Sequence, residues 1–337
     1  MNMFLPTSGT TETDSINRVS VVMPTHNRAA LFAEALSSVC TQTWRQWDVV
    51  IVDDASTPAV VVPDLPEFSG KFELLRNGKS IGGAASKAAG TYKSDGDVIA
   101  YLDDDDLYQA RFLESAVDVL NRYPEVDVLF MGVDWFGNNS VDEELGHESA
   151  LARVFSIAQP MEVEADLWRF DQRLLAALLR TVPMCFQRPV VRRSALEKIG
   201  LHRSDCLLWD CEWALRAALV SRCALLNRPL YRQRVDGQGY HSLPDRVLAQ
   251  LRSGAEMTLR LYRDPPAGVS AEAVELLKEA ASRYTFDLAY ALSKQGSFKE
   301  AMHYWLLSQQ IQPELKRLKF LFGALARAVG RALKPKS

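Results

Sequence analysis

The sequence predicts an α/β fold in which a largely parallel sheet carries helices on both faces, followed by a helical C-terminal region. Two observations predict this class. Short apolar runs typical of buried strands alternate with segments whose apolar residues recur at helical spacing, which is the pattern of βαβ units. Beyond about Leu243 the strand-like runs stop and only helical patterns continue.

Each element is expected from its own local pattern. Apolar runs bounded by turn or acidic residues predict strands at 19–23, 49–52, 72–75, 98–102 and 126–131. Helical spacing predicts helices at 28–40, 82–89, 112–120, 163–180, 194–199 and 210–220. Residues 138–148 are interpreted as a loop or insertion, 184–191 as a strand, and 283–313 as a helix pair that turns at Gly296 and Ser297.

The composition indicates a globular protein rather than a disordered or nucleic-acid-binding one. Of the 337 residues, 47% are hydrophobic and 24% are charged, which is ordinary for a soluble globular chain. The formal net charge of −3 provides no basic field, so no nucleic-acid partner is expected. The five cysteines form no C-x-x-C pair and are odd in number, which favours reduced thiols in a cytoplasmic protein over disulfides or a zinc site.

The two ends of the chain differ from its body. Residues 1–18 contain no apolar run and are expected to be disordered rather than a signal peptide. No apolar stretch reaches about 18 residues, so no transmembrane helix is expected. Residues 314–337 hold seven Lys/Arg against one acid. They predict either a basic amphipathic helix on the inner face of a membrane or a helix packed on the domain.

Polar residues follow three of the predicted strands, at the point where each strand ends. The first is followed by Thr25 and Asn27, the second by Asp53 and Asp54, and a later one by an acid cluster of four aspartates at 103–106. The carboxyl ends of parallel strands meet at one edge of a sheet, where ligands of such folds bind. The sequence therefore predicts a site at this edge.

Four segments resemble those of family 2 glycosyltransferases of the GT-A fold. They read VSVVMPTHNRAALFAEALSSVCTQTW, DVVIVDDAST, GDVIAYLDDDD and VVRRSALEKIG…LLWDCEWALRAAL, in the order and spacing of that family across residues 19–235. The resemblance implies a catalytic domain at 19–242, with the helical region 243–337 added to it. It also implies inverting transfer of a sugar from a nucleoside diphosphate, UDP favoured over dTDP or GDP, to a hydroxyl acceptor.

The acid cluster is similar to the D-x-D element of the family. The resemblance implies that Asp103 and Asp105 bind Mn²⁺ or Mg²⁺, with Asp104 beside them in the donor site. Carboxylates suit these hard cations, and four crowded carboxylates repel one another without a cation. The alternative is a solvated acidic turn.

The nucleotide pocket is implied by the first two segments and by a position in the helix at 82–89. The resemblance implies that Asp54 accepts the N3–H of uracil, whereas turns and helix caps are the alternative roles. Where the family has the arginine of A-R-N, this chain has a lysine, which keeps the charge without the planar fork. The implied pocket residues are Pro24, Thr25, Asn27, Arg28, Asp53, Asp54 and Lys87.

The general base is implied by the last segment. Asp210 stands at the aspartate of the family's E-D element, although the preceding residue is Trp209 instead of glutamate. It would take the proton of the acceptor hydroxyl, with Glu212 in reserve and a helix cap as the alternative. Arg234 stands where the family often has histidine and could pair with a phosphate, or lie in a solvated loop.

The expected function is therefore sugar transfer to a saccharide, lipid-linked or protein acceptor in surface polysaccharide or glycoconjugate synthesis. Two alternatives stay open. A sugar-nucleotide-binding protein of the same fold could have lost the chemistry. A nucleotidyltransferase would need a Gly-rich basic loop after the first strand, and residues 24–27 are not such a loop.

Overall fold

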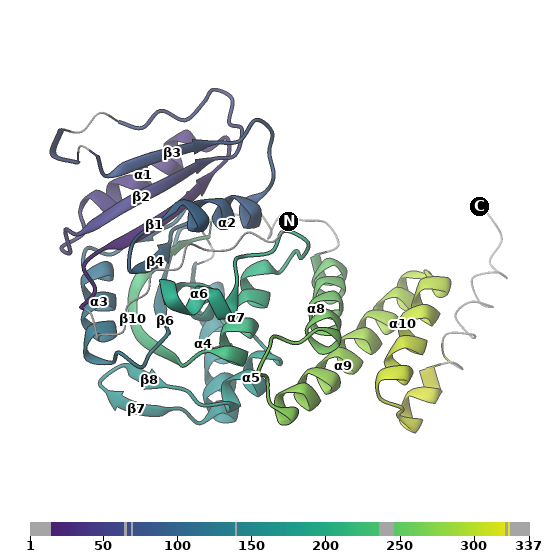
Figure 1. The fold of residues 1–337 in the computed structure, drawn as a ribbon. Coiled ribbons are helices and arrows are strands. Elements are labelled where there is room, and N and C mark those ends of the chain that lie inside the picture. The colour runs from purple at the N-terminus through teal and green to yellow at the C-terminus, as the bar shows by residue number, and fades with distance from the viewer. Residues whose placement is uncertain are drawn as a thin grey trace. The chain divides into compact units, whose positions relative to one another are not determined.

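A computed structural model describes residues 15–63, 66–68, 70–138, 140–235, 246–320 and 323. The chain divides into two compact units (Figure 1). The sheet unit contains residues 1–205 and 209–237, and the helical unit contains residues 206–208 and 238–337. At the N-terminus, Ile16 is buried and the backbone N–H groups of Asn17 and Arg18 donate to Asp97.

The sheet unit is built on one mixed sheet of strand order β3-β2-β1-β4-β9-β6-β10-β8-β7, with β5 added to β10. Strands β3, β2, β1 and β4 are parallel, β9 is antiparallel to β4 and β6, and β6 is parallel to β10. The carboxyl ends of β1, β2, β4, β6 and β10 therefore lie along one edge. The strands are β1 Val19–Thr25, β2 Trp47–Asp53, β3 Phe72–Arg76, β4 Val98–Tyr101, β5 Leu107–Tyr108, β6 Val128–Phe136, β7 Met161–Glu164, β8 Leu167–Arg169, β9 Pro189–Arg192 and β10 Cys223–Arg234.

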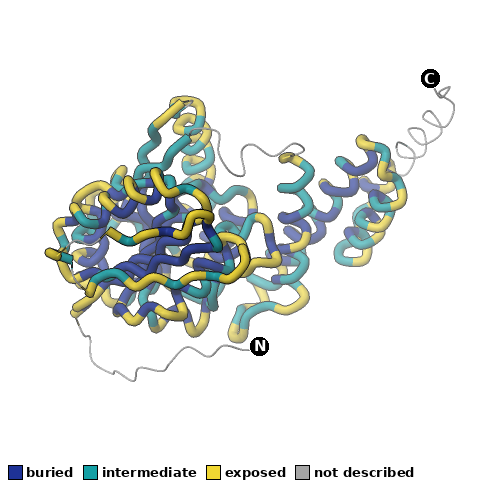
Figure 2. The backbone as a smooth tube through the Cα atoms, turned by 90° about the horizontal axis from the view of Figure 1, so that it is seen from above, coloured by how far each residue is buried: buried dark blue, intermediate teal, exposed yellow. Residues whose placement is uncertain are grey.

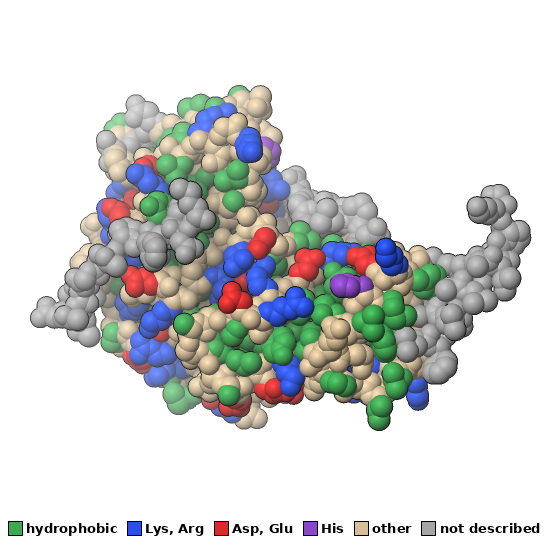
Figure 3. Space-filling view, turned by 45° about the vertical axis from the view of Figure 1, so that its right-hand side comes forward, with side chains coloured by type: hydrophobic (Ala, Val, Ile, Leu, Met, Phe, Trp, Pro, Cys, Tyr) green, Lys and Arg blue, Asp and Glu red, His purple; other side chains and the backbone are tan. Residues whose placement is uncertain are grey.

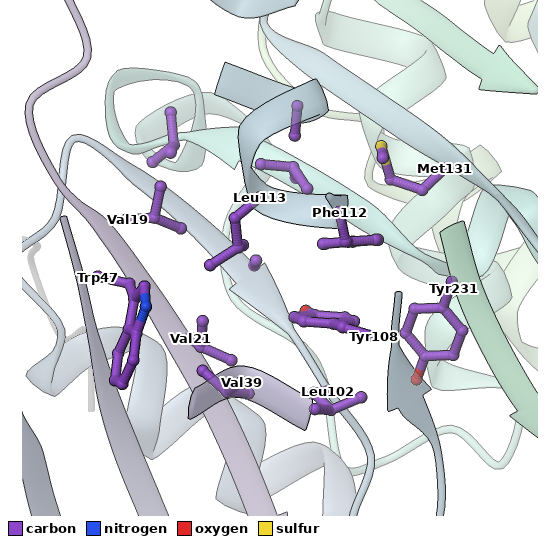
Figure 4. Packing of buried hydrophobic residues seen from close by; sticks show 14 of the residues in the cluster. Val19, Val21, Val39, Trp47, Leu102, Tyr108, Phe112, Leu113, Met131 and Tyr231 are labelled. Atoms are coloured by element: carbon purple, nitrogen blue, oxygen red, sulfur yellow. The ribbon is translucent and has the colours of Figure 1, made fainter. Parts of the chain in front are cut away.

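Helices cover both faces of this sheet because alternate strand residues point to opposite sides. Val21 of β1 belongs to the core that includes α1 and α3, whose packing is shown in Figure 4. Val22 faces the other side, where α2 lies so close that a Cβ on Gly90 would be 2.5 Å from Val22 Cγ1. The helices of this unit are α1 Ala29–Cys40, α2 Gly83–Lys93, α3 Phe112–Arg122, α4 Ser140–Ala158, α5 Arg173–Leu178, α6 Arg193–Ile199 and α7 Trp209–Val220.

Most expected elements are confirmed, including the parallel strands at the N-terminal side and the helix that ends at Gly200, whose φ is +77°. Figure 2 shows the buried strands at the centre of this unit. On the face shown in Figure 3, basic and acidic side chains are interspersed.

Three expectations for residues 138–191 are wrong. The polar stretch interpreted as a loop forms the beginning of helix α4. Its sequence is polar because most of this helix is exposed, and only Val154 and Ala158 of its residues are buried. The helix expected at 163–180 is a β7–β8 hairpin followed by the short α5. The strand expected at 184–191 begins only at Pro189, after a 3₁₀ turn at Met184–Gln187.

Strand β10 was not predicted, and it is irregular. Leu226 pairs with Met131 and Tyr231 with Val133, so five steps along β10 match two along β6. Residues 227–230 leave the ladder there, and their backbone approaches Gly132, where a Cβ would lie 2.4 Å from the Arg228 carbonyl oxygen. Glycine is needed at position 132 because no side chain fits this gap.

The helical unit contains α8 Arg246–Arg263, α9 Ala271–Gln295 and α10 Phe298–Ile311. The expected helix pair is confirmed: α9 ends at Gly296 with φ of +93°, and α10 packs on α9 through Leu288, Leu292 and Trp305. Most of the basic stretch 314–337 lies outside the described residues. Among those that are described, no helix has the length and apolar character needed to cross a membrane.

Candidate active site

The carboxyl edge of the sheet brings together most of the polar residues that the sequence singled out. Thr25 at the end of β1 pairs with Asp53 at the end of β2, and β4 lies on the other side of β1 and leads into the acid cluster. All the side chains of the candidate site belong to the sheet unit. Pro24 is a buried residue of β1 that pairs with Val52.

The outer side of the acid cluster is held from the first strand end. Thr25 Oγ1 donates to Asp104 Oδ2 at 2.8 Å. Arg28 Nη1 lies 3.0 Å from Asp104 Oδ1 and 2.7 Å from Asp105 Oδ2. Arg28 is the residue before α1, and no side chain caps that helix, so Thr25 and Asn27 do not serve as its cap.

The inner side of the acid cluster is held by two buried cations. Lys87 Nζ of α2 lies 2.8 Å from Asp103 Oδ1. Arg188, which precedes β9 and is 5% exposed, places Nη2 3.5 Å from Asp103 and 3.4 Å from Asp106. Asp106 also accepts hydrogen bonds from Tyr231 Oη at 2.8 Å and from the Arg234 backbone N–H at 2.9 Å. The repulsion among the four carboxylates is thus offset by arginine and lysine side chains of the protein itself.

These surroundings separate the carboxyl pKa values. Burial alone would raise the pKa of Asp103, but Lys87 and Arg188 outweigh it and lower that pKa to about 2. Burial raises the pKa of Asp106 to about 7, against the opposing effect of Arg188. Burial also raises the pKa values of Asp104 and Asp105. Asp103 is therefore ionised at neutral pH, whereas Asp106 is poised to hold a proton.

The expected general base lies beside this cluster. Asp210 stands inside the first turn of α7, with its side chain 17% exposed. Its Oδ1 is 3.6 Å from Lys87 Nζ and 3.7 Å from His202 Nε2. Burial raises the pKa of Asp210 to about 6, while Lys87 opposes that rise. A carboxylate that becomes ionised just below neutral pH is suited to accept a proton from a hydroxyl group.

The reserve candidate for the base has a different role. Glu212 is buried and pairs with Arg216 one turn along α7, with Arg216 Nη2 2.8 Å from Glu212 Oε2. The same guanidinium donates to the Leu201 carbonyl at 2.9 Å, so the pair holds the start of α7 to the chain that precedes it.

Asp54, which follows β2, is held by neutral donors rather than by cations. Asp54 accepts four hydrogen bonds from the next loop, which lower its pKa to about 2 although burial would raise it. These four donors fill the usual lone-pair positions of a carboxylate, so uracil N3–H could be accepted only if one of them gave way. The donors are Asn77 Nδ2 at 2.8 Å, Ser80 Oγ at 2.7 Å, Ile81 N at 2.9 Å and Gly82 N at 2.9 Å.

Three other residues singled out from the sequence make contacts that stabilise the surrounding structure. Asp53 accepts from the backbone N–H groups of Ser56 at 2.8 Å and Val60 at 3.1 Å, and pairs with Arg76. Asn27 Oδ1 accepts from the Thr57 N–H at 2.7 Å. Arg234 lies at the end of β10, where its Nε donates to the Asp105 carbonyl at 2.9 Å and its Nη2 pairs with Glu34 at 2.6 Å. Arg234 therefore braces the acid cluster instead of lying in a solvated loop.

Two site residues were missed from the sequence. His202 was missed because nothing near it in the sequence suggests a partner. Arg188 precedes the buried strand Pro189–Arg192, and a lone charge beside an apolar run is the signal that could have indicated a buried ion pair.

The carboxylates of the cluster suit a divalent cation that is coordinated partly by the protein and partly by a diphosphate. Within the described part of the chain, no three carboxylate, histidine or cysteine side chains converge to form a metal cage. Mg²⁺ is usually held by one or two carboxylates, with water and substrate phosphates completing its shell. Asp103 and Asp105 are suited to this role because their side chains are 27% and 23% exposed, whereas Asp106 is fully buried.

The family follows from a comparison with known proteins. Residues 20–200 match the model of glycosyl transferase family 2. The match covers more than half of the chain, and the chain therefore belongs to this family.

Two bacterial relatives illustrate the likeness. YwdF of Bacillus subtilis, an uncharacterised glycosyltransferase, is 32% identical over 60% of this chain and 68% of its own length. WfgD of Escherichia coli, named as a UDP-Glc:alpha-D-GlcNAc-diphosphoundecaprenol beta-1,3-glucosyltransferase, is 27% identical over 36% of this chain and 48% of its own length. The chain spans only 37% to 48% of the length of the first curated relatives that it matches.

Solved structures confirm the fold class. TarS of S. aureus (residues 1–349), in complex with UDP-GlcNAc, aligns with a TM-score of 0.62 at 15% identity, covering 93% of this chain and 88% of that one. The mannosyltransferase PcManGT of Pyrobaculum calidifontis, in complex with GDP-Man and Mn²⁺, aligns with a TM-score of 0.53 at 17% identity, covering 96% and 84%. At these identities the likeness concerns the fold alone.

Proposed function

We propose that this protein is an inverting glycosyltransferase that moves a sugar from a nucleoside diphosphate to a hydroxyl acceptor. The observation that carries the proposal is the place of Asp210. A single carboxylate with a pKa of about 6 lies beside a cation-bound acid cluster, at the carboxyl edge of the sheet. This arrangement puts a proton acceptor next to a site suited to a charged leaving group.

The residues divide the reaction between them. Asp210 takes the proton of the acceptor hydroxyl as its oxygen forms a bond to the anomeric carbon. The bond from that carbon to the diphosphate oxygen breaks, and its electron pair leaves with the diphosphate. Arg28 adds positive charge near the departing group. A bound Mn²⁺ or Mg²⁺, held by Asp103 and Asp105, would offset the charge of the diphosphate.

UDP is the proposed nucleotide of the donor. WfgD is named for UDP-Glc, and TarS forms complexes with UDP and UDP-GlcNAc. The GDP-Man complex of PcManGT keeps a GDP-sugar as the second choice, and its Mn²⁺ supports a divalent ion. We expect Thr25, Asn27 and Asp54 to lie near the bound nucleotide, and the contact of Asp54 with uracil is a prediction.

A lipid-linked saccharide in surface polysaccharide or glycoconjugate synthesis is the proposed acceptor, which WfgD's diphosphoundecaprenol acceptor supports. Contact with the inner face of a membrane would suit it. In the helical unit, Leu315 is 86% exposed and Leu318 41% exposed, and Lys316 and Lys319 are exposed beside them. Co-sedimentation with anionic but not neutral vesicles would support this contact. Equal recovery with both would contradict it.

A thermal-shift series tests the donor site. The melting temperature is measured with UDP, GDP, dTDP and CDP, each with and without Mn²⁺, for the wild type and Asp105→Ala. Stabilisation by UDP that needs Mn²⁺ and is lost in the variant is the expected result, since a ligand of the folded state raises stability. Release of UDP from a UDP-sugar then separates an enzyme from a degenerate binding protein. Incorporation of a nucleotide into product would instead indicate a nucleotidyltransferase.

A further inference from the structure

The expected base is approached by two nitrogen atoms at the same oxygen. Lys87 Nζ lies 3.6 Å and His202 Nε2 3.7 Å from Oδ1 of Asp210. For both residues the contact with Asp210 is made to Oδ1. One oxygen of the carboxylate is thus flanked by these two side chains, and Oδ2 is the candidate to meet a substrate.

We propose that Lys87 and His202 are positioning residues that orient Asp210 through Oδ1, so that Oδ2 is presented to the acceptor hydroxyl. The inference rests on the proposed function, in which Asp210 is the base. Both distances exceed ordinary hydrogen-bond length, as is common in active sites without substrate, where such contacts tighten in the complex. A role in positioning differs from the grip on the nucleotide that the sequence suggested for Lys87.

Lys87 is fixed on more than one side. Its side chain is 2% exposed, its ammonium lies 2.8 Å from Asp103, and the Trp209 ring faces it at 4.5 Å. Trp209 precedes Asp210 in the chain, so the lysine contacts both the base and the base's neighbour. The buried ammonium of Lys87 lies between the carboxylates of Asp103 and Asp210, and separating it from either one would cost free energy. Lys87 therefore links the expected base to the acid cluster.

His202 is enclosed by aromatic rings. Its ring is stacked on Trp213 at 5.4 Å and meets Tyr101 at 4.9 Å and Trp209 at 5.4 Å edge to face. Burial, together with the charges of Lys87 and Arg216, lowers the pKa of His202 well below its usual value. The imidazole is therefore neutral. Its Nδ1 is buried and finds no partner among the described residues, so Nε2 is the nitrogen available to donate to Asp210.

Steady-state kinetics separate positioning from donor binding. Lys87→Met and His202→Leu are expected to lower kcat for sugar transfer by about 10- to 100-fold and to change the donor KM by less than about threefold, because a misplaced base slows only the chemical step. Lys87→Arg and His202→Gln, which keep an N–H group within reach, should recover part of kcat. Lys93→Met, an exposed lysine of the same helix, is the control.

A double-variant cycle asks whether the two residues act through the base. In an Asp210→Asn background, Lys87→Met and His202→Leu should cost little more, because the group that they position is already lost. A full additional loss in that background would overturn the proposal. So would a raised donor KM with unchanged kcat in Lys87→Met, which would instead assign the lysine to the donor.

Crystal structures decide the inference even where no turnover is found. Wild-type protein that neither transfers nor hydrolyses any sugar nucleotide would refute the proposed function. The orientation of Asp210 can still be compared between the wild type, Lys87→Met and His202→Leu. A second side-chain rotamer of Asp210 in both variants is expected, and an unchanged single rotamer in both would refute positioning.

Discussion

Asp54 after β2 and the acid cluster after β4 occupy equivalent places at the carboxyl edge of the sheet, yet they have different kinds of partner. Asp54 is met by neutral N–H and O–H donors of one local loop, no more than 28 residues away along the chain. The acid cluster is met by Arg28, Lys87 and Arg188, which come from three separate parts of the chain. Four neutral donors occupy the lone pairs of Asp54, whereas the cations of the acid cluster are shared between carboxylates, which leaves lone pairs of those carboxylates for a ligand. Asp54 should therefore serve stability alone, whereas Asp105 of the acid cluster should serve activity.

The largest effect is expected where the cluster's own cation is removed. Arg188→Met leaves Asp103 and Asp106 without their shared guanidinium in a buried setting, and should lower the free energy of unfolding by about 3–5 kcal/mol. Chemical denaturation measures it. Arg222→Met removes an exposed arginine paired with Asp127 and should cost no more than about 1 kcal/mol. Similar losses in the two variants would show that burial of Arg188 does not matter.

Activity should separate from stability in the cluster itself. Asp105→Asn is expected to reduce kcat/KM by about 10²- to 10³-fold, because it removes a charged group from the leaving-group side of the site. The melting temperature should stay close to that of the wild type. Asp118→Asn, at an exposed carboxylate on α3, is the matched control for both measurements. Activity near the wild-type value in Asp105→Asn would count against the donor site.

The opposite outcome is expected at the first acid pair. Asp54→Asn places an amide against N–H donors and should lower the free energy of unfolding by about 2 kcal/mol, the value that corresponds to its lowered pKa. For a unit of this size that is a fall of about 4–8 °C in melting temperature. Asp95→Asn, at a side chain that is 73% exposed, should change little. A variant of Asp54 as stable as the wild type would remove the distinction between the two strand ends.

The smallest effect is a difference in pH dependence. The pKa of Asp54 is lowered to about 2, so its contribution to stability is present above the ordinary carboxyl pKa and is lost as pH falls through about 2. The pKa of Asp106 is raised to about 7, so its contribution is present below the ordinary carboxyl pKa and is lost as pH rises through about 7.

Denaturation between pH 5 and 8 tests this difference. The free energy of unfolding of the wild type should fall, relative to Asp106→Asn, by up to about 1.4 kcal/mol per pH unit. Asp54→Asn should keep the wild-type slope over this range. Parallel curves for the wild type and Asp106→Asn would mean that Asp106 is not protonated in the folded protein.

The sequence predicts those parts of the fold whose residues are buried in a regular pattern. Strands β1 and β4 are buried along their whole length and β2 at every residue except Asp48, and their apolar runs are unmistakable. Helix α4 was missed because it is mostly exposed, and the β7–β8 hairpin because only Leu167 of its residues is buried. Strand β10 was missed because its ladder is interrupted at Pro229, where no apolar alternation continues.

The site shows the same division. Asp103, Asp105 and Asp210 could be proposed as site residues because each lies in or directly after a segment that resembles the family. Their partners Arg28 and Lys87 were also singled out, as nucleotide-pocket residues. Arg188 and Tyr231, which contact Asp106, were not, because these contacts join distant positions: Arg188 lies 82 residues from Asp106, and Tyr231 lies 125 residues from it. An aspartate that accepts hydrogen bonds from a loop and an aspartate that pairs with a cation cannot be told apart by residue type. Only the partners distinguish Asp54 from Asp103.

The interruption in β10 makes the geometry of the site depend on a count of residues. Side chains of a strand alternate between faces, so the number of residues that leave the ladder between Leu226 and Tyr231 sets the phase of everything after it. Tyr231 reaches Asp106 because that phase is correct. A deletion of one residue there would keep every side chain of the site chemically intact, yet it would turn Tyr231 and Gln233 to the wrong face. We therefore expect the residue types at 227–230 to vary more freely than the number of residues in this segment, because adding or removing a single residue would reverse the faces of the strand that follows.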